Sequence, residues 1–400
     1  MKRLLRDLGQ VVTPSGTHAP LRGRDLGAVD VIEDAYVLSD ANTIVEVGRM
    51  RDLKPVDGDV HEVSCPGMCA IPGLVDCHTH VAFAGDRVEE FSLRAGGASY
   101  EELHAAGGGI LSTVRATRAA AADGTLDEAT ARHVLWMQNA GTTTFEGKSG
   151  YGLDRETELA SLKAVQALGG VPTWLGAHAV PPEFDGDADA YLDFALGDVL
   201  PEAAKIAKAA DVFVERGAFD AAQARRYLTA CSDAGLALRL HGDQFTEQGA
   251  IPLAIELGAR SVDHLEATGD EGVRALARSE VVGVLLPASA LFLGRGMPPA
   301  RALVDAGAAV ALATDFNPGS SFTESLPLVC SLAATQLKLS PAEALSAVTV
   351  NAAHVLGCAD RVGRLAAGFD SDIVLLDVPD WRYLAYHLAG SLIGQIAGSS

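Results

Sequence analysis

Two histidines separated by a single residue, His78 and His80, have a spacing that can bind a metal ion. They follow an apolar run at residues 71–77 that has the composition of a buried strand. In an extended chain, residues i and i+2 lie on the same side, so both imidazoles can reach one ion at about 2.0–2.1 Å. Such a pair is weak evidence alone, because polar residues are common where strands end.

Three further polar residues, His241, His264 and Asp315, each come directly after an apolar, strand-like run. Taken singly, each is as well explained as a hydrogen-bonded buried residue. In a (β/α)8 barrel, however, the carboxyl ends of all the strands form one rim, where active sites lie. Together with His78 and His80 they offer imidazoles and a carboxylate that suit zinc or iron. Such a site leaves a position open for a water molecule that acts as a nucleophile.

The elements that must position these residues are eight apolar runs alternating with helical patterns, which is typical of βα units and a parallel sheet. The expected strands are residues 71–77, 142–146, 171–177, 211–215, 236–240, 261–263, 281–286 and 309–314. Thr125 with Glu128 and Ser340 with Glu343 are predicted capping boxes that begin two helices, which Gly141 and Gly357 are expected to end. Eight such strands predict a closed (β/α)8 barrel.

Both ends of the chain show short β-rich runs in place of helical periodicity, at residues 35–38, 44–48 and 373–377. We expect residues 1–70 plus 366–400 to build one small β-sandwich domain, with residues 391–400 as an edge strand. Residues 71–365 would form the barrel. A length of 400 residues fits one barrel with one small satellite domain.

The acidic composition limits the kinds of partner that we expect this protein to bind. The formal net charge is −21, so the surface repels phosphate, and neither nucleic acid nor an anionic membrane is an expected partner. The N-terminus carries no apolar run of signal-peptide length, and the apolar stretch 281–294 is broken by Pro287 and too short to span a bilayer. Six scattered cysteines are read as free thiols, which favours a reducing cytoplasm.

The order of a strand ending in His-x-His, two later histidines and a strand-eight aspartate resembles the amidohydrolase superfamily, whose satellite domain is built from both chain ends. Several segments are similar to the imidazolonepropionases in particular. They are residues 83–91, 107–110, 148–153, 175–178, 263–266 and 314–320. The resemblance covers nearly the whole chain.

The resemblance implies hydrolytic ring opening of 4-imidazolone-5-propionate, which gives N-formimidoyl-L-glutamate in histidine degradation, with one zinc or iron ion. It implies a metal-binding role for His78, His80, His241 and Asp315. It implies substrate contacts for Arg87, Tyr151, His178, Gln244, Asn317, Gly319 and Ser320. It also allows a homodimer, for which the sequence shows no exposed apolar stripe.

The chemistry of these residues is consistent with such roles. The planar cationic fork of Arg87 suits the propionate tail, although without the resemblance a surface ion pair with a neighbouring glutamate is the likelier reading. His178 and His264 could polarise the ring carbonyl or hold the developing oxyanion. Asp315, beside the metal-bound water, could accept a proton and pass it to the leaving nitrogen.

Two alternatives stay open at this point. A deaminase of a cyclic amidine or purine would use the same rim, but related ring deaminases have a proton-shuttling Glu three residues after the strand-five histidine, where this chain has Gln244. We assign Gln244 to hydrogen bonding with substrate or water. An inactive barrel serving as a binding module would show a broken ligand set, whereas this set is intact. A bridging carbamylated lysine is not expected, because in binuclear relatives it belongs to strand four, which ends here at Glu215, whereas Lys148 ends strand two.

Overall fold

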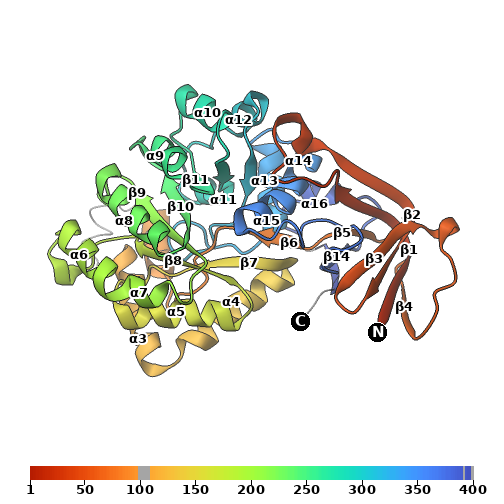
Figure 1. Cartoon of the computed structure of the whole chain (residues 1–400), viewed down its shortest axis with the longest axis horizontal. Coiled ribbons are helices and arrows are strands. Elements are labelled where there is room, and N and C mark those ends of the chain that lie inside the picture. Colours follow the sequence, from red (N-terminus) through yellow and green to blue (C-terminus); the bar gives the residue numbers. More distant parts are fainter. Residues whose placement is uncertain (98–108, 391, 398–400) are drawn as a thin grey trace.

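The computed structural model describes residues 1–97, 109–390 and 392–397. It contains an eight-stranded parallel barrel wrapped in helices and, beside it, a seven-stranded mixed sheet that holds both ends of the chain (Figure 1). The predicted (β/α)8 barrel with a β-rich domain built from both chain ends is therefore confirmed. The predicted domain limits, 1–70 plus 366–400 and 71–365, stay a prediction.

The barrel strands follow one another in chain order, and each pairs in parallel with the next. They are β6 (Leu74–Asp76), β7 (Thr142–Lys148), β8 (Val171–Ala177), β9 (Ala209–Val214), β10 (Ala237–Gly242), β11 (Ser261–His264), β12 (Val282–Leu285) and β13 (Val310–Leu312). Between the last and first strands the chain bridges from Thr79 to Phe316. Two backbone hydrogen bonds support that bridge: Asp315 donates to His78 at 3.0 Å, and His80 donates to Phe316 at 3.0 Å. Barrel closure thus places two predicted ligand strands side by side.

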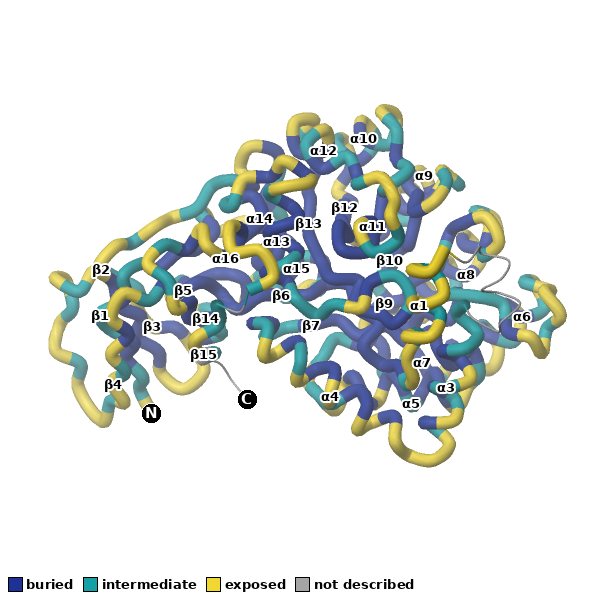
Figure 2. Tube along the Cα trace, turned by 180° about the vertical axis from the view of Figure 1, so that it is seen from behind, coloured by how far each residue is buried: buried dark blue, intermediate teal, exposed yellow. Residues whose placement is uncertain are grey.

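Helices cover the outside of the barrel, whose strands are mostly buried (Figure 2). Buried apolar side chains of the helices and strands form one core cluster. The main helices are α1 (Val88–Ala95), α3 (Ile110–Asp123), α4 (Leu126–Asn139), α5 (Arg155–Ala167), α6 (Ala188–Phe194), α7 (Leu200–Ala203), α8 (Ala221–Asp233), α9 (Ala250–Leu257), α10 (Asp270–Ala277), α11 (Pro287–Phe292), α12 (Ala300–Ala306), α13 (Leu326–Thr335), α14 (Pro341–Ala347), α15 (Val350–Leu356) and α16 (Tyr383–Tyr386). The helix α1 is the exception, because it buries none of its residues.

The mixed sheet has the order β15-β14-β5-β1-β2-β3, with β4 also paired to β1. Its strands are β1 (Lys2–Pro14), β2 (Val29–Asp40), β3 (Thr43–Arg49), β4 (Val60–Ser64), β5 (Cys69–Pro72), β14 (Ile373–Leu376) and β15 (Ile393–Ala397). The expected C-terminal edge strand is confirmed in β15, which pairs antiparallel with β14; Ser391 and residues 398–400 lie outside the described residues.

The prediction of one continuous strand over residues 71–77 is wrong. Gly73 divides it: β5 belongs to the mixed sheet, whereas β6 belongs to the barrel. Gly73 donates to the carbonyl of Asp372 at 2.8 Å, and a Cβ at this position would collide with the Thr143 side chain. Glycine fits here because the Thr143 side chain fills the space that a Cβ would need.

Two helix details also differ from prediction. The Thr125 side chain accepts no capping bond from α4, because Thr125 has helical dihedral angles (φ −91°, ψ −4°) in place of the extended ones typical of an N-cap. Its hydroxyl donates to Asp123 at 2.7 Å. Ser340 and Glu343 do form the predicted capping box. Gly357, however, ends α15 and not the helix that Ser340 begins, since α14 and α15 are separate helices.

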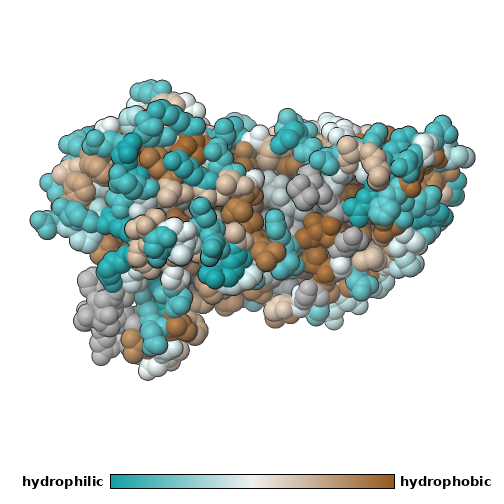
Figure 3. Space-filling view, turned by 90° about the horizontal axis from the view of Figure 1, so that it is seen from below, coloured by the Kyte–Doolittle hydropathy of each residue, from teal (hydrophilic) through white to brown (hydrophobic). Residues whose placement is uncertain are grey.

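The cysteines are free thiols, as the sequence predicted. All six cysteines are free, and all but Cys358 are buried. On the face seen in Figure 3, hydrophobic residues form separate patches among hydrophilic ones. None of the helices described here combines the length and apolar character needed to cross a bilayer. Of the segment 107–110 that carried part of the resemblance, Gly107 and Gly108 lie outside the described residues.

Candidate metal centre

Three imidazoles converge at the carboxyl ends of the barrel strands. The Nε2 atoms of His241 and His80 are 3.3 Å apart, and the ligand nitrogens of His78, His80 and His241 all lie within 4.8 Å of one another. All three side chains are buried. The sequence therefore folds so that the end of the first strand and the end of the fifth face a common point.

The Asp315 carboxylate faces the same point. Its Oδ1 atom lies 3.4 Å from Nε2 of His80 and 3.6 Å from Nε2 of His78. His264 is close as well, because a nitrogen of His264, one of His78 and an oxygen of Asp315 lie within 4.8 Å of one another. The structure thus brings together all five residues that the strand ends predicted to meet.

These donors fit a metal ion. Two ligands that each lie about 2.0–2.1 Å from an ion at a tetrahedral angle are separated by about 3.3 Å. The observed separations of 3.3, 3.4 and 3.6 Å are close to that value. In addition, Nε2 of His78 is buried and makes no hydrogen bond with the described residues. A buried nitrogen without a partner is costly unless a ligand that is absent here takes its lone pair.

Hydrogen bonds from the turn after β13 hold the Asp315 carboxylate. Asn317 donates from Nδ2 to Oδ1 at 2.9 Å, and Ser320 donates from Oγ to Oδ2 at 3.1 Å. The side-chain oxygen Oδ1 of Asn317 in turn accepts from the backbone N–H groups of Gly319 and Ser320, both at 2.8 Å. In the described structure the side chains of Asn317 and Ser320 thus orient the Asp315 carboxylate by hydrogen bonds. Their predicted contact with substrate stays a prediction.

The backbone is strained at the ends of two site strands. Asp315 has φ 54° and His264 has φ 87°, in the left-handed region that side chains other than glycine rarely adopt. Asp263 points into the barrel, so the regular alternation of β11 would turn the side chain of the next residue, His264, outward. The left-handed conformation at His264 instead directs its side chain toward the rim. Strain of this kind persists where surrounding contacts fix it, and it is common at functional sites.

Burial shapes the charge of the centre. Desolvation lowers the pKa of His241 to about 4 and lowers the pKa of His78 well below its ordinary value. Desolvation acts to raise the pKa of Asp315, but the hydrogen bond with His80 and the nearby His264 outweigh it and hold the pKa at about 2. Neutral imidazoles and an ionised carboxylate are the forms that bind a metal.

Two more predicted substrate residues lie beside the ligand histidines. The ring of His178 stacks on that of His80 with centroids 5.3 Å apart, and the ring of Tyr151 lies 5.8 Å from His80. Nδ1 of His178 is 2.9 Å from the carbonyl oxygen of Gly150, so Nδ1 carries the proton in that hydrogen bond. Nε2 of a neutral His178 is then left as an acceptor.

The Arg87 side chain comes from the residue before α1 and packs against the turn that holds Asp315. A Cβ on Gly319 would lie 2.6 Å from its Nη1 atom, so glycine makes room for the guanidinium. Arg87 donates from Nε to Thr113 at 3.2 Å and lies 3.6 Å from the carboxylate of Glu90. The pairing with Glu90 considered from the sequence is therefore present, and Arg87 also faces the site.

The predicted residue Gln244 is nearly buried in the turn after β10. That turn is held by Glu215, whose Oε2 accepts from the backbone N–H groups of Phe245 at 2.9 Å and Thr246 at 3.0 Å. Glu215, which follows the fourth barrel strand, thus anchors the Gln244 turn.

Sequence reasoning missed the charged residues beneath the centre. Asp263 Oδ2 lies 2.6 Å from Nδ1 of His78, and Asp211 Oδ1 lies 3.0 Å from Nδ1 of His241. Such carboxylates orient ligand histidines and fix which nitrogen faces the metal. The available signal was a charged residue inside an otherwise apolar strand.

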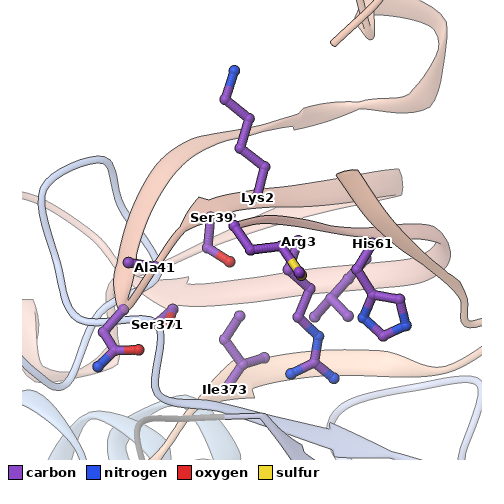
Figure 4. A pocket seen from close by; sticks show the side chains of 10 residues that line it. Lys2, Arg3, Ser39, Ala41, His61, Ser371 and Ile373 are labelled. Carbon is purple, nitrogen blue, oxygen red and sulfur yellow. The ribbon is translucent and has the colours of Figure 1, made fainter. Parts of the chain in front are cut away.

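A pocket on the mixed sheet is separate from this centre (Figure 4). It is lined by Met1, Lys2, Arg3, Leu5, Ser39, Ala41, Asn42, His61, Ser371 and Ile373, none of which belongs to the predicted site. The side chain of Lys2 points away from those of Arg3 and His61. The pocket therefore offers no cluster of metal ligands.

A parallel barrel with a His-x-His strand end, a strand-five histidine and a strand-eight aspartate at one rim defines a hydrolase of the amidohydrolase class. The sequence pattern of the Amidohydrolase family matches residues 69–394. Within that class the chain belongs to the imidazolonepropionase family. It is 59% identical to the imidazolonepropionase of Rubrobacter xylanophilus, over 99% of this chain and 97% of that protein. It is 46% identical to that of Chloroflexus aggregans, over 98% of this chain and 96% of the relative.

Solved structures resemble the fold at greater distance. An adenosine deaminase from Xanthomonas campestris with bound zinc has a TM-score of 0.68 at 20% identity, covering 99% of this chain and 91% of that one. The Escherichia coli guanine deaminase has a TM-score of 0.69 at 16% identity, covering 100% and 97%. At such identities the likeness concerns the fold alone.

Proposed function

We propose that this chain opens the ring of 4-imidazolone-5-propionate by hydrolysis to N-formimidoyl-L-glutamate, in histidine degradation, with one zinc or iron ion. The observation that carries the proposal is a cluster of buried metal-type donors beside an arginine that can bind a propionate. Arg87 packs on Gly319, which is bonded to the side chain that holds Asp315. The 59% identity to an imidazolonepropionase supports the same reaction.

His78, His80, His241 and Asp315 would hold the ion, and both zinc and iron accept imidazole with carboxylate. When bound, the ion lowers the pKa of a water molecule so that it becomes a nucleophile near neutral pH. The reaction adds water across one ring C–N bond, with oxygen going to carbon and a proton to nitrogen. Asp315 would accept the proton of the water and deliver it to the leaving nitrogen.

The remaining residues orient the substrate. Arg87 would bind the propionate carboxylate with the part of its fork that Thr113 does not use. His178, with its Nδ1 proton given to Gly150, would accept from a ring N–H through Nε2. His264 has its Nδ1 3.5 Å from Glu266, whose carboxylate outweighs burial and raises the pKa of His264. Of His178 and His264, His264 is thus the better hydrogen-bond donor to the developing oxyanion.

Deamination of a cyclic amidine or purine on the same barrel is the competing reaction. It requires a carboxyl group that moves a proton at the third position after the strand-five histidine. Gln244 stands there, and an amide cannot exchange a proton in this way. The direct roles proposed for Gln244 are hydrogen bonds to substrate or to the attacking water.

The test is the ultraviolet-monitored decay of freshly generated imidazolone propionate with purified protein, before and after chelation, and with zinc or iron restored. We expect acceleration that chelation abolishes and the metal restores, with formiminoglutamate as the identified product. The variant His78→Ala is the control for metal bound elsewhere. No acceleration by fully metallated protein would overturn the proposal and direct attention to cyclic amidine deamination.

A further inference from the structure

Five charged side chains form a cluster inside the barrel, directly beneath the metal centre. Glu146 and Lys148 come from β7, Asp211 from β9, Arg239 from β10 and Asp263 from β11, and each is at most 1% exposed. Three carboxylates thus share two cations in a buried interior, where an uncompensated charge is very costly. The hydrolytic mechanism described above uses none of these residues directly.

Two of the carboxylates connect the cluster to the metal centre. Asp211 Oδ1 is 3.0 Å from Nδ1 of His241, and Asp263 Oδ2 is 2.6 Å from Nδ1 of His78. Each carboxylate accepts the Nδ1 proton, which leaves the Nε2 lone pair for a metal. The direction of two of the proposed ligand nitrogens therefore depends on where these carboxylates stand.

The Lys148 ammonium lies between those carboxylates. Its Nζ is 2.6 Å from Oδ2 of Asp211 and 3.9 Å from Oδ2 of Asp263, and it is 2.9 Å from Oε2 of Glu146. Asp211 uses one oxygen for Lys148 and the other for His241. Without the ammonium, the two aspartates would face each other with no cation between them.

We propose that Lys148 is a positioning residue of the metal centre, which holds Asp211 and Asp263 in place and through them fixes His241 and His78. The inference rests on the metal role proposed for these histidines. A carbamylated Lys148 is incompatible with the same geometry, because an anionic carbamate would lie among three carboxylates. The other buried cation, Arg239, pairs with Glu146 and donates to the carbonyl of Val355 at 3.1 Å. It makes no hydrogen bond or ion pair with Asp211 or Asp263, the carboxylates that contact the ligand histidines.

That difference supplies a matched control. Lys148→Met and Arg239→Met each remove one buried positive charge from the same cluster, but only the first removes the contact to Asp211. We expect Lys148→Met to weaken zinc binding by the metal-free protein by about 10- to 100-fold, the usual effect of losing a group that orients a ligand. Arg239→Met should stay within about threefold, and Lys148→Arg should recover part of the loss because it keeps the charge.

Zinc affinity is measured by competition with a chromophoric chelator, and ligand geometry by the visible absorption of the cobalt-substituted protein. A role confined to folding would leave both unchanged in a variant that remains folded. Should Lys148→Met not fold, Lys148→Met with Asp263→Asn preserves the charge balance and is compared with Asp263→Asn alone. Wild-type zinc affinity in folded Lys148→Met, or an equal loss in Arg239→Met, overturns the inference.

The two proposals fail in different ways. If the wild-type protein binds zinc and hydrolyses imidazolone propionate while Lys148→Met matches it in affinity and cobalt spectrum, the positioning role fails and the proposed function stands. If the wild-type protein binds zinc no better than His78→Ala, the proposed metal centre itself fails. The positioning role is judged from zinc affinity and the cobalt spectrum alone, and turnover of the wild-type protein decides only the proposed function.

Discussion

Replacement of Arg87 by alanine tests how the substrate carboxylate is bound. The Arg87 fork has one donor committed to Thr113, and Glu90 lies 3.6 Å from Nη1, so one or two hydrogen bonds remain for a ligand. The Arg87 side chain is 12% exposed, so the interaction is only partly screened by water. A hydrogen bond to a charged group contributes about 1.5–3 kcal/mol net, so we expect KM for the propionate substrate to rise by about 10- to 150-fold.

The assay is the initial rate of imidazolone decay over a range of substrate concentrations, with kcat and KM separated. An analogue without the propionate carboxylate should show a much smaller change, because it never used the fork. Arg94→Ala removes a like charge from α1, the helix that Arg87 precedes. The Arg94 guanidinium lies over the rings of Phe91 and Phe292, so this variant should leave KM unchanged. An equal rise in KM for the analogue would remove Arg87 from the substrate site.

Three further changes have definite expected outcomes. Asp315→Asn should lower kcat by at least about 100-fold, because the proton acceptor is lost. The unfolding midpoint of the metal-free protein should stay within a few degrees, because the barrel core is unchanged. Turnover equal to wild type contradicts the site assignment. Glu158→Gln should cost about 3 kcal/mol in urea unfolding, because its carboxylate accepts from Gly150, Gly152 and Leu153 at 2.9–3.0 Å; wild-type stability argues against this anchoring of the Tyr151 loop. Burial lowers the pKa of His133, so the folded protein keeps this histidine neutral. Below the unfolded pKa of about 6.5 the unfolded chain binds a proton that the folded protein does not, so the free energy of unfolding falls as the pH drops. His133→Gln should therefore flatten the slope of unfolding free energy against pH between pH 7 and 5 by at most about 1.4 kcal/mol per pH unit, and a slope identical to wild type contradicts this prediction.

The barrel and the centre could be predicted because both depend on chain-local patterns. Seven of the eight strands begin within two residues of their expected positions, and apolar runs that end in a histidine or aspartate mark the rim. The break at Gly73 could not be predicted from periodicity, since residues on both sides of it are apolar and extended. What divides them is the partner each side pairs with, and that depends on strands far away in sequence.

The charge cluster beneath the centre escaped prediction for a related reason. Lys148 and Asp211 are 63 positions apart, and nothing local to either shows that barrel closure turns both side chains inward to a contact of 2.6 Å. A charged residue within an apolar strand signals that a partner exists, because an isolated buried charge is too costly, but it does not identify that partner.

Contacts from outside the proposed ligand set fix the direction of its side chains. For Asp315 those contacts come from its own turn, through Asn317 and Ser320. For His241 they come from another strand, through Asp211. A substitution at Asn317 or Ser320 should therefore change the position of one ligand, Asp315. A substitution at Lys148 should change the positions of two ligands, His241 and His78, and a larger loss of metal affinity would distinguish it.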